Sequence, residues 1–244
     1  MLTFGKTSEC QIIRNGQTVR KRGSRVRIEE SRALTFAHSL QLPVPRVHAV
    51  TASSSETEIV MDFIDGECLE EAWQSMASEQ KQSIAVQVRQ IVTTMRQAES
   101  DSRSKIGGFD GPARDCRQFS DYCGGPFESV SEFNLFTLDL LRGTPLAIRK
   151  TLADALAACS SGDVRIVLTH GDLTPRNIIV KEGRVQALLD WEYAGWYPEY
   201  WEYVKFFDRP TDCKDWKDYA EVMFDAPYPT ELLTFQALAR WQKP

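Results

Sequence analysis

Hydrophobic and polar positions alternate in the first part of the chain in the way that β-strands require. Residues 10–22 alternate on both sides of the Asn15-Gly16 pair, which is a strong signal for a hairpin turn. Residues 29–40 instead carry apolar side chains at helical spacing, and this helix ends before the Leu-Pro-Val-Pro segment that follows it. We expect two more strands, at 46–50 and 56–64. The first 65 residues therefore predict a small α+β lobe.

After Asp65-Gly66 the apolar spacing becomes mainly helical. In residues 83–95, apolar side chains recur at intervals of four, three and four, which predicts an amphipathic helix. The stretch 100–130 is rich in Gly, Asp, Ser and Pro and predicts a long loop. Further elements are expected as helices at 131–142 and 146–159, strands at 165–169 and within 178–189, and aromatic-rich helix from Pro198 onward. The chain is thus expected to divide into parts 1–65 and 66–244.

The composition is that of an ordinary globular protein, with 42% apolar and 26% charged residues. Because 34 Asp and Glu outnumber 29 Lys and Arg, the net charge of −5 argues against a nucleic-acid-binding surface. No apolar run is long enough to span a bilayer, and the first residues lack the apolar core of a signal peptide. The six cysteines show no C-x-x-C spacing. We therefore expect a reduced cytoplasmic protein with no nucleic-acid or membrane partner.

The chemically informative segment is residues 168–192, LTHGDLTPRNIIVKEGRVQALLDWE. Asp172 lies in the turn after a strand, and two further strands follow it as a hairpin. If the hairpin folds just after Gly183, Asn177 and Asp190 lie opposite each other, about 5 Å apart. A carboxylate and an amide oxygen at that separation can bind one Mg²⁺ ion together with phosphate oxygens.

A free carboxylate beside such a metal site is the apparatus of phosphoryl transfer, because the metal neutralises phosphate charge while the carboxylate accepts or orients the hydroxyl proton. The protein-kinase pattern H-R-D-L-x-x-x-N is met by residues 170–177, HGDLTPRN, except that Gly171 replaces Arg. Asp190 takes the Asp position of the D-F-G motif, followed by Trp191 and Glu192. No segment ending in A-P-E follows, so a protein kinase is the weaker interpretation.

HGDLTPRNIIV and LLDWEYAGWYPEYWEYVKF resemble the aminoglycoside phosphotransferase / choline kinase family, and within it most closely the fungal members. Other segments are similar as well. VRKRG…EESRALTFAHSLQLPVPRVHAV resembles the family's lysine strand, glutamate helix and P-x-P turn, IVMDFIDGECLEEAW its hinge, and GGPFESVSEFN a segment common in the fungal members. The resemblance covers residues 17–210. It implies a two-lobed, protein-kinase-like α+β fold, with a small nucleotide-binding lobe over 1–65 and a larger, mostly helical lobe over 66–244.

The resemblance also implies an activity. The chain would transfer the γ-phosphoryl group of ATP to a hydroxyl of a small molecule, with Mg²⁺ as metal cofactor. At the positions that match the family's motifs, Asp172 is the implied catalytic base, and Asn177 and Asp190 are the implied Mg²⁺ ligands. Members of the family phosphorylate antibiotics, choline-like amines and other small alcohols, and the acceptor stays open among these. The oligomeric state stays open too.

The implied nucleotide site lies in the first 65 residues. Lys21 would contact the α- and β-phosphates of ATP, and Glu30 would hold this lysine from the following helix. Glu29 is the competing partner, since it precedes Glu30 directly; the family's E-x-x-A-L spacing favours Glu30. The hinge would bind adenine through backbone groups and would consist of Met61, Asp62, Phe63 and Ile64.

The N-terminus departs from the family pattern. Only twenty residues precede Lys21, and no Gly-rich phosphate loop is recognisable among them. Gly5, Thr7 and Ser8 are the residues that could line a shortened turn, and we expect the first strand to be abbreviated or absent. Because backbone N–H groups of such a loop normally bind the phosphates, a second function stays open. This is a kinase-shaped protein without phosphotransfer, acting as a binding module or as a repurposed enzyme of specialised metabolism.

Several of these residues also have a structural interpretation. His170 is predicted to brace its loop rather than to act in catalysis. Lys21 lies in a basic run, residues 20–22, and such a run is usually a solvated strand face. Glu30 could be a first-turn helix acid. The aromatic residues between 196 and 203 could cage a cationic substrate, although packing of the large lobe is favoured for most of them. The glutamates that would assist such a cage are Glu192, Glu199 and Glu202.

Overall fold

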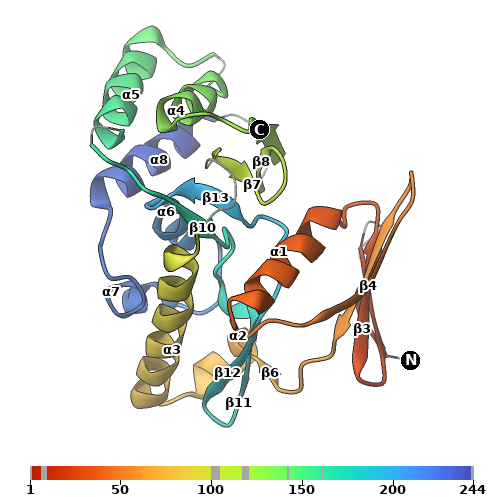
Figure 1. Ribbon diagram of the computed structural model, residues 1–244. Helices are drawn as coiled ribbons and strands as arrows, with labels where there is room; N and C mark the ends of the chain where they lie inside the picture. Colours follow the sequence, from red (N-terminus) through yellow and green to blue (C-terminus); the bar gives the residue numbers. More distant parts are fainter. Residues whose placement is uncertain are drawn as a thin grey trace.

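A computed structural model describes residues 2–6, 10–99, 105–116, 121–141, 143–160 and 162–242 of the chain. Its N-terminal part is a five-stranded antiparallel sheet, with strand order β1-β2-β3-β5-β4, and one helix, α1. Figure 1 shows this sheet at one side of the molecule, with α1 between it and the helices that follow. The elements are β1 Leu2–Lys6, β2 Gln11–Asn15, β3 Thr18–Gly23, α1 Ile28–Ser39, β4 Val47–Ala52 and β5 Thr57–Asp62.

The hairpin predicted around Asn15-Gly16 is present as β2 and β3, and Gly16 has the positive φ of +63° that its turn needs. The expectation of an abbreviated or absent first strand is wrong, because β1 is a five-residue strand paired with β2. Gly5 weakens the strand signal of this short segment, so its pairing with β2 is what defines the strand. Gly5 belongs to β1, whereas Thr7 and Ser8 lie outside the described residues.

The remaining elements form the larger part of the molecule, which is mostly helical (Figure 1). They begin with β6 Glu67–Cys68, α2 Leu69–Ala72, η1 Trp73–Ser75, α3 Ser78–Gln97, β7 Gly107–Gly108, β8 Ala113–Cys116, β9 Asp121–Gly124, α4 Val130–Asp139 and α5 Leu146–Cys159. They continue with β10 Ile166–Thr169, η2 Pro175–Asn177, β11 Ile178–Lys181, β12 Arg184–Leu188, β13 Gly195–Pro198, α6 Trp201–Asp208, η3 Trp216–Tyr219, α7 Ala220–Met223 and α8 Pro229–Trp241.

Helix α3 packs against α7 and β10, and its predicted apolar face is the face it buries. Ile84, Val88, Ile91 and Met95 are at most 6% exposed and belong to a core that continues into the N-terminal sheet through residues such as Ile59. Side chains three and four positions apart lie on the same side of a helix. The spacing read from the sequence therefore placed this helix correctly. Within the described residues, no helix is both long enough and apolar enough to cross a bilayer.

The sequence was misleading at two places in this part. The described portions of 100–130 are not only loop, because they contain the short strands β7, β8 and β9. Strand β13 was also missed, although it pairs with β10 from Ile166 opposite Pro198 onward. Its sequence, GWYP, contains two residues that are uncommon in strands. The glycine is required here: a Cβ at Gly195 would lie 2.1 Å from the carbonyl oxygen of Gly107.

Residues 63–66 connect the sheet to the rest of the chain. Strand β5 ends just before them, and β6 just after them pairs with β11, where Cys68 lies opposite Ile179. Gly66 approaches β11 so closely that a Cβ there would lie 2.6 Å from the carbonyl oxygen of Val180. The predicted division of the chain at residue 65 falls in this connection. The assignment of 1–65 and 66–244 as separate lobes stays a prediction.

Candidate active site

A cleft of about 930 Å³ is lined by residues from both the sheet and the larger part of the molecule. Asp172 does not line it: this residue is 4% exposed and lies behind Arg176, whose side chain does line the cleft. The other residues predicted from the sequence all line the cleft: Lys21, Glu30, Met61, Asp62, Phe63, Ile64, Asn177 and Asp190.

Lys21 joins the two walls of this cleft. Its side chain leaves β3, and Nζ donates to Oε1 of Glu30 at 2.8 Å and to Oδ1 of Asp190 at 2.7 Å. Of the two candidate glutamates, Glu30 is therefore the partner, because its position in α1 turns it inward and leaves it only 2% exposed. Lys21 is not part of a solvated strand face, since its side chain is 12% exposed.

Burial and ion pairing have opposite effects on the pKa values of Glu30 and Lys21. Burial raises the pKa of Glu30 to about 7, and the attraction of Lys21 opposes that rise. Burial alone would lower the pKa of Lys21, but Glu30 and Asp190 outweigh it and raise the value. A lysine held by two carboxylates stays protonated, which keeps one permanent positive charge in the cleft.

The turn that carries Asp172 is held from behind by His170. Nε2 of His170 lies 2.9 Å from the carbonyl oxygen of Leu189, and Nδ1 lies 3.2 Å from the backbone N of Asp172. Since a backbone N–H can only donate, Nδ1 accepts and the ring is neutral, in agreement with a pKa that burial lowers. As predicted, His170 braces its loop. Gly171 has a φ of +79°, and a Cβ there would lie 3.1 Å from the Tyr193 carbonyl oxygen, which explains why the arginine of the kinase pattern is absent.

The carboxylate of Asp172 is surrounded by donors. Nη2 of Arg176 lies 2.9 Å from Oδ1 and 3.0 Å from Oδ2, and Nδ2 of Asn177 donates to Oδ2 at 2.9 Å. Nε of Arg209 lies 3.4 Å from Oδ1. Arg176 is the accessible one of the two cations, because its side chain is 39% exposed and that of Arg209 only 7%. Sequence reasoning assigned no role to either arginine.

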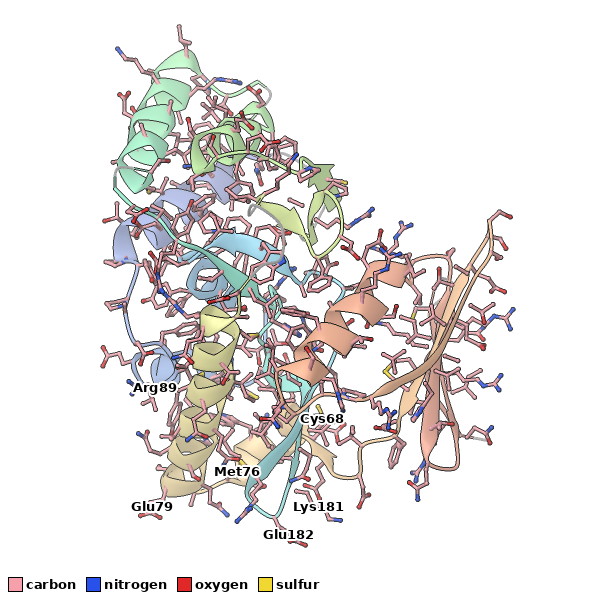
Figure 2. The ribbon with its side chains drawn as sticks, viewed as in Figure 1. Cys68, Met76, Glu79, Arg89, Lys181 and Glu182 are labelled. Carbon is pink, nitrogen blue, oxygen red and sulfur yellow. The ribbon has the colours of Figure 1, made fainter. Side chains whose placement is uncertain are left out.

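The predicted register of the β11–β12 hairpin is wrong by one residue. Glu182 and Gly183 both have positive φ and form a two-residue turn one position earlier than expected. Further along, Gln186 of β12 is an extra residue between the pairs Val180–Val185 and Ile179–Ala187. As a result the carbonyl oxygen of Asn177 accepts a hydrogen bond from the backbone N–H of Leu189, at 2.7 Å, and Asp190 follows as the next residue. Asn177 and Asp190 still line the same cleft. Figure 2 shows Lys181 and Glu182 at the tip of this hairpin.

Asn177 and Asp190 offer the donor set of a magnesium site. Nδ2 of Asn177 is bonded to Asp172, so its amide oxygen points away from that carboxylate. Asp190 keeps 34% of its side chain exposed, and only Oδ1 bonds to Lys21. No cluster of three or more His, Cys, Asp or Glu in the described ranges could hold a metal by itself. One carboxylate and one amide suit Mg²⁺ bound mainly through nucleotide phosphates and water.

Glu202 lies under the turn that carries Asp172 and not in a substrate cage. Its carboxylate accepts the backbone N–H of His170 at 2.5 Å and that of Gly171 at 3.2 Å. It is 3% exposed, and burial raises its pKa to about 7. The sequence signal for this position was an acid inside an apolar helix, which needs a buried partner.

The aromatic residues near it pack the large core, as favoured from the sequence. Tyr197, Tyr200 and Trp201 are at most 3% exposed, and the rings of Tyr197 and Trp201 stack with centroids 5.8 Å apart. The carboxylate of Glu199 is bound by two cations of the protein, Arg96 at 3.1 Å and Arg165 at 3.0 Å. The expectation of a cage assisted by glutamates is therefore not met by Glu199 or Glu202.

A sequence profile of the phosphotransferase enzyme family, APH, matches residues 20–227. The fold is similar to that of a thermostable mutant of aminoglycoside phosphotransferase APH(4)-Ia solved with AMP-PNP and hygromycin B, with a TM-score of 0.68 at 16% identity, over 98% of this chain and 83% of that one. For ADP-bound aminoglycoside phosphotransferase APH(2'')-Ib the TM-score is 0.68 at 18% identity, over 96% of this chain and 80% of that one. For the streptomycin–ATP complex of APH(2'')-IIa the TM-score is 0.63 at 16% identity, over 96% of this chain and 76% of that one. These likenesses confirm the kinase-like α+β fold. No curated protein sequence matches the chain.

Proposed function

We propose, because this chain belongs to the phosphotransferase enzyme family, that it transfers the γ-phosphoryl group of ATP to a hydroxyl group of a small molecule. The observation that carries the proposal is the meeting of Lys21, Glu30 and Asp190 in one cleft. A lysine held by a helix glutamate beside a metal-binding aspartate is the arrangement with which kinases hold nucleotide phosphates. Membership of the fungal branch stays a prediction.

The nucleotide would bind between residues 1–65 and the larger part of the chain. We assign adenine to the hinge, Met61 to Ile64, which lines the cleft. The backbone N–H groups of Asp62 and Phe63 already donate to the carbonyl oxygens of Arg46 and Gln17. Adenine would therefore use other backbone groups of this segment. Lys21 would contact the α- and β-phosphates from β3.

Asn177 and Asp190 would hold Mg²⁺ through an amide oxygen and a carboxylate oxygen. When bound, the ion neutralises the charge of the transferring phosphate. Lys21 already binds Oδ1 of Asp190 and fixes the direction of that carboxylate. The hydrogen bond from Asn177 to Asp172 fixes the amide in the same way. Lys21 and Asp172 would thus hold the side chains of Asp190 and Asn177 in place before the ion binds.

Asp172 is the proposed base, which accepts or orients the proton of the acceptor hydroxyl. Its Oδ1 and Oδ2 are both bonded to Nη2 of Arg176, so an acceptor hydroxyl has to displace this guanidinium to reach the carboxylate. Arg176 is half-buried at the cleft side, whereas Asn177 and Arg209 hold Asp172 from within the protein. Displacing Arg176 leaves the carboxylate oriented and opens one side of it to the acceptor.

A kinase-shaped protein without phosphotransfer is the second candidate. The observation that favours it is the covered state of Asp172, together with the direct ion pair between Lys21 and Asp190. Both contacts occupy groups that transfer would need. The two candidates differ in one outcome: a binding module responds to nucleotide but never releases ADP.

The test is a screen for acceptor-stimulated ADP release from Mg-ATP. The acceptors should include choline, simple neutral alcohols, and hygromycin B, streptomycin and gentamicin, which accompany the similar structures. We expect at least one acceptor to stimulate release, and Asp172→Asn to lose that stimulation. If Asp172→Asn keeps acceptor-stimulated ADP release, Asp172 is not the base. A thermal shift with Mg-ATP but no release with any acceptor would favour the binding module.

A further inference from the structure

A cluster of buried charges lies behind the turn that carries Asp172. Asp115 in β8, Lys205 in α6 and Arg209 just after α6 are 2%, 1% and 7% exposed. Asp115 accepts hydrogen bonds from both cations: its Oδ2 from Nζ of Lys205 at 2.5 Å, and its Oδ1 from Nη2 of Arg209 at 2.9 Å. Removing a charge from water is costly unless the charge is well paired. Lys205 also binds a second carboxylate, that of Asp208, at 2.5 Å, whereas Asp115 lies between Lys205 and Arg209 and contacts both. A carboxylate buried between two cations therefore calls for an explanation beyond packing.

Arg209 connects this cluster to the catalytic turn. While Nη2 is held by Asp115, Nε donates to the carbonyl oxygen of Gly171 at 3.0 Å and lies 3.4 Å from Oδ1 of Asp172. The guanidinium is planar, and its donors point in fixed directions. The bond to Asp115 therefore sets the direction in which Nε points at the turn. The ring of Tyr193 lies over the guanidinium, 4.6 Å from its carbon, and restricts its rotation further.

We propose that Asp115 is a positioning residue for the reaction, and that it acts on Asp172 through Arg209. This inference rests on the proposed function, because that function makes Asp172 the base. Asp115 does two things for it. It fixes the guanidinium that holds the turn through Gly171, and its charge balances that of Arg209, which would otherwise bind Asp172 more tightly and compete with the acceptor hydroxyl.

The substitution Asp115→Asn separates these effects from gross loss of structure. The amide has nearly the same shape as the carboxylate but has one acceptor oxygen and one donor nitrogen. It can accept from Lys205 or from Arg209, but not from both in the present geometry. Whichever cation keeps the amide oxygen, Arg209 loses the negative charge that faces it from Asp115, and the attraction between Arg209 and Asp172 is no longer balanced.

A purely structural role predicts a different result. If the cluster only fastened α6 to β8, its loss would lower the melting temperature and leave the turnover of the folded enzyme unchanged. The matched control is Glu199→Gln, which also breaks a largely buried ion pair, with Arg96, whose side chains are 12% and 19% exposed. The side chain of Glu199 binds Arg96, Arg165 and Tyr228, and none of these residues belongs to the turn at 170–177. The control therefore reports the effect of lost stability alone.

The experiment measures basal ADP release from Mg-ATP, with water as the acceptor, well below the melting temperature of each variant. We expect Asp115→Asn to lower kcat by about tenfold or more, with KM for Mg-ATP changed less than about twofold. Glu199→Gln is expected to keep kcat. Arg209→Lys, which keeps the charge but loses the planar fork, should lower kcat similarly, and the double variant with Asp115→Asn should lower it no further.

The following kinetic results would contradict the proposal. If kcat of Asp115→Asn stays near that of the parent, or if its effect simply multiplies with that of Arg209→Lys, Asp115 does not act through Arg209. Should Asp115→Asn fail to fold, Asp115→Asn combined with Lys205→Met removes one charge of each sign, and the same loss of kcat is required of it. A parent enzyme that releases no ADP with water or with any acceptor of the screen overturns the proposed function and this inference together, whereas an active parent with an equally active variant overturns this inference alone.

Discussion

The ammonium nitrogen of Lys21 lies 2.7 Å from Oδ1 of Asp190, a residue 169 positions later in the chain. This contact joins the N-terminal sheet to the segment that follows the β11–β12 hairpin. Glu30 shares the same ammonium at 2.8 Å, so one cation serves a carboxylate from each wall of the cleft. The stability of the cleft and its chemistry therefore depend on the same side chain.

Replacing that cation should destabilise the protein strongly. Lys21→Met leaves Glu30, which is 2% exposed, without its positive partner. We expect a loss of about 3 kcal/mol in the free energy of unfolding at pH 7, measured by urea denaturation. Lys81→Met is the control: Lys81 is similarly buried, with 13% of its side chain exposed, but its partner Asp215 is 42% exposed. The control should cost about 1 kcal/mol or less, and equal losses in the two variants would contradict the prediction.

Gly171→Ala should cost more than an ordinary substitution of a turn glycine. At Gly171 an alanine would adopt a φ of +79° and approach the Tyr193 carbonyl oxygen to 3.1 Å, whereas Gly183, at +75°, has nothing within 4 Å. We expect about 2–3 kcal/mol for Gly171→Ala and about 1 kcal/mol for Gly183→Ala. Chemical denaturation of both variants measures the difference. A ΔΔG for Gly171→Ala no larger than that for Gly183→Ala would show that the turn can move away from Tyr193.

Glu202 gives the protein a pH-dependent stability. Burial raises its pKa in the folded state to about 7, from an ordinary value of 4.5. Between these values the folded protein binds a proton that the unfolded chain has released, so this stabilisation is complete below pH 4.5 and is lost as the pH rises through 7.

Glu202→Gln cannot titrate and should remove this dependence. Between pH 5 and 8, we expect the free energy of unfolding of the variant to gain on that of the parent by about 2 kcal/mol. The glutamine amide also faces the two backbone N–H groups that Glu202 accepts from, and this lowers the stability of the variant. Because that loss is the same at every pH, it does not affect the pH dependence. In Glu199, burial raises the pKa but the bonds to Arg165 outweigh it and lower the value. Glu199→Gln should therefore show no such change in this range.

Asn177→Asp should make the protein dependent on magnesium. Nδ2 of Asn177 donates to Oδ2 of Asp172 at 2.9 Å, so the substitution sets two carboxylates against each other. With EDTA we expect a melting temperature lower by roughly 5 °C, and with Mg²⁺ a rise larger than that of the parent protein. Asn134→Asp is a buried control far from the cleft, where the amide bonds to Ser160 at 2.7 Å, and its melting temperature should not respond to Mg²⁺. Equal responses to Mg²⁺ in the parent and Asn177→Asp would place the metal elsewhere.

The sequence predicted best what depends on short spacings. The helix expected at 146–159 has these bounds in the structure, and the hairpin at Asn15-Gly16 is present because a glycine at that position permits the turn. The contact between Lys21 and Glu30 followed from a family motif and not from periodicity. The run of basic residues 20–22, taken by itself, would have placed Lys21 on a solvated strand face.

The features that were missed depend on geometry that short patterns do not carry. The register of Asn177 was wrong because the Glu-Gly turn moves the pairing by two residues and a bulge moves it back by one. Asp115 was not a candidate at all, since its bond to Arg209 joins residues 94 positions apart. Such contacts arise from the packing of β8 against α6, for which neither segment has a local signal.

The short connection between the sheet and the helical part limits how the cleft can move. Only residues 63–66 lie between β5 and β6, and β6 is bonded to β11 of the catalytic hairpin, with Gly66 held closely against Val180. A pivot of this length, anchored at both ends by strand pairing, permits rotation but little translation. We therefore expect any opening of the cleft to be a rotation of the sheet about residues 63–66, which separates Lys21 from Asp190 and changes the distance from the hinge to Asn177 little.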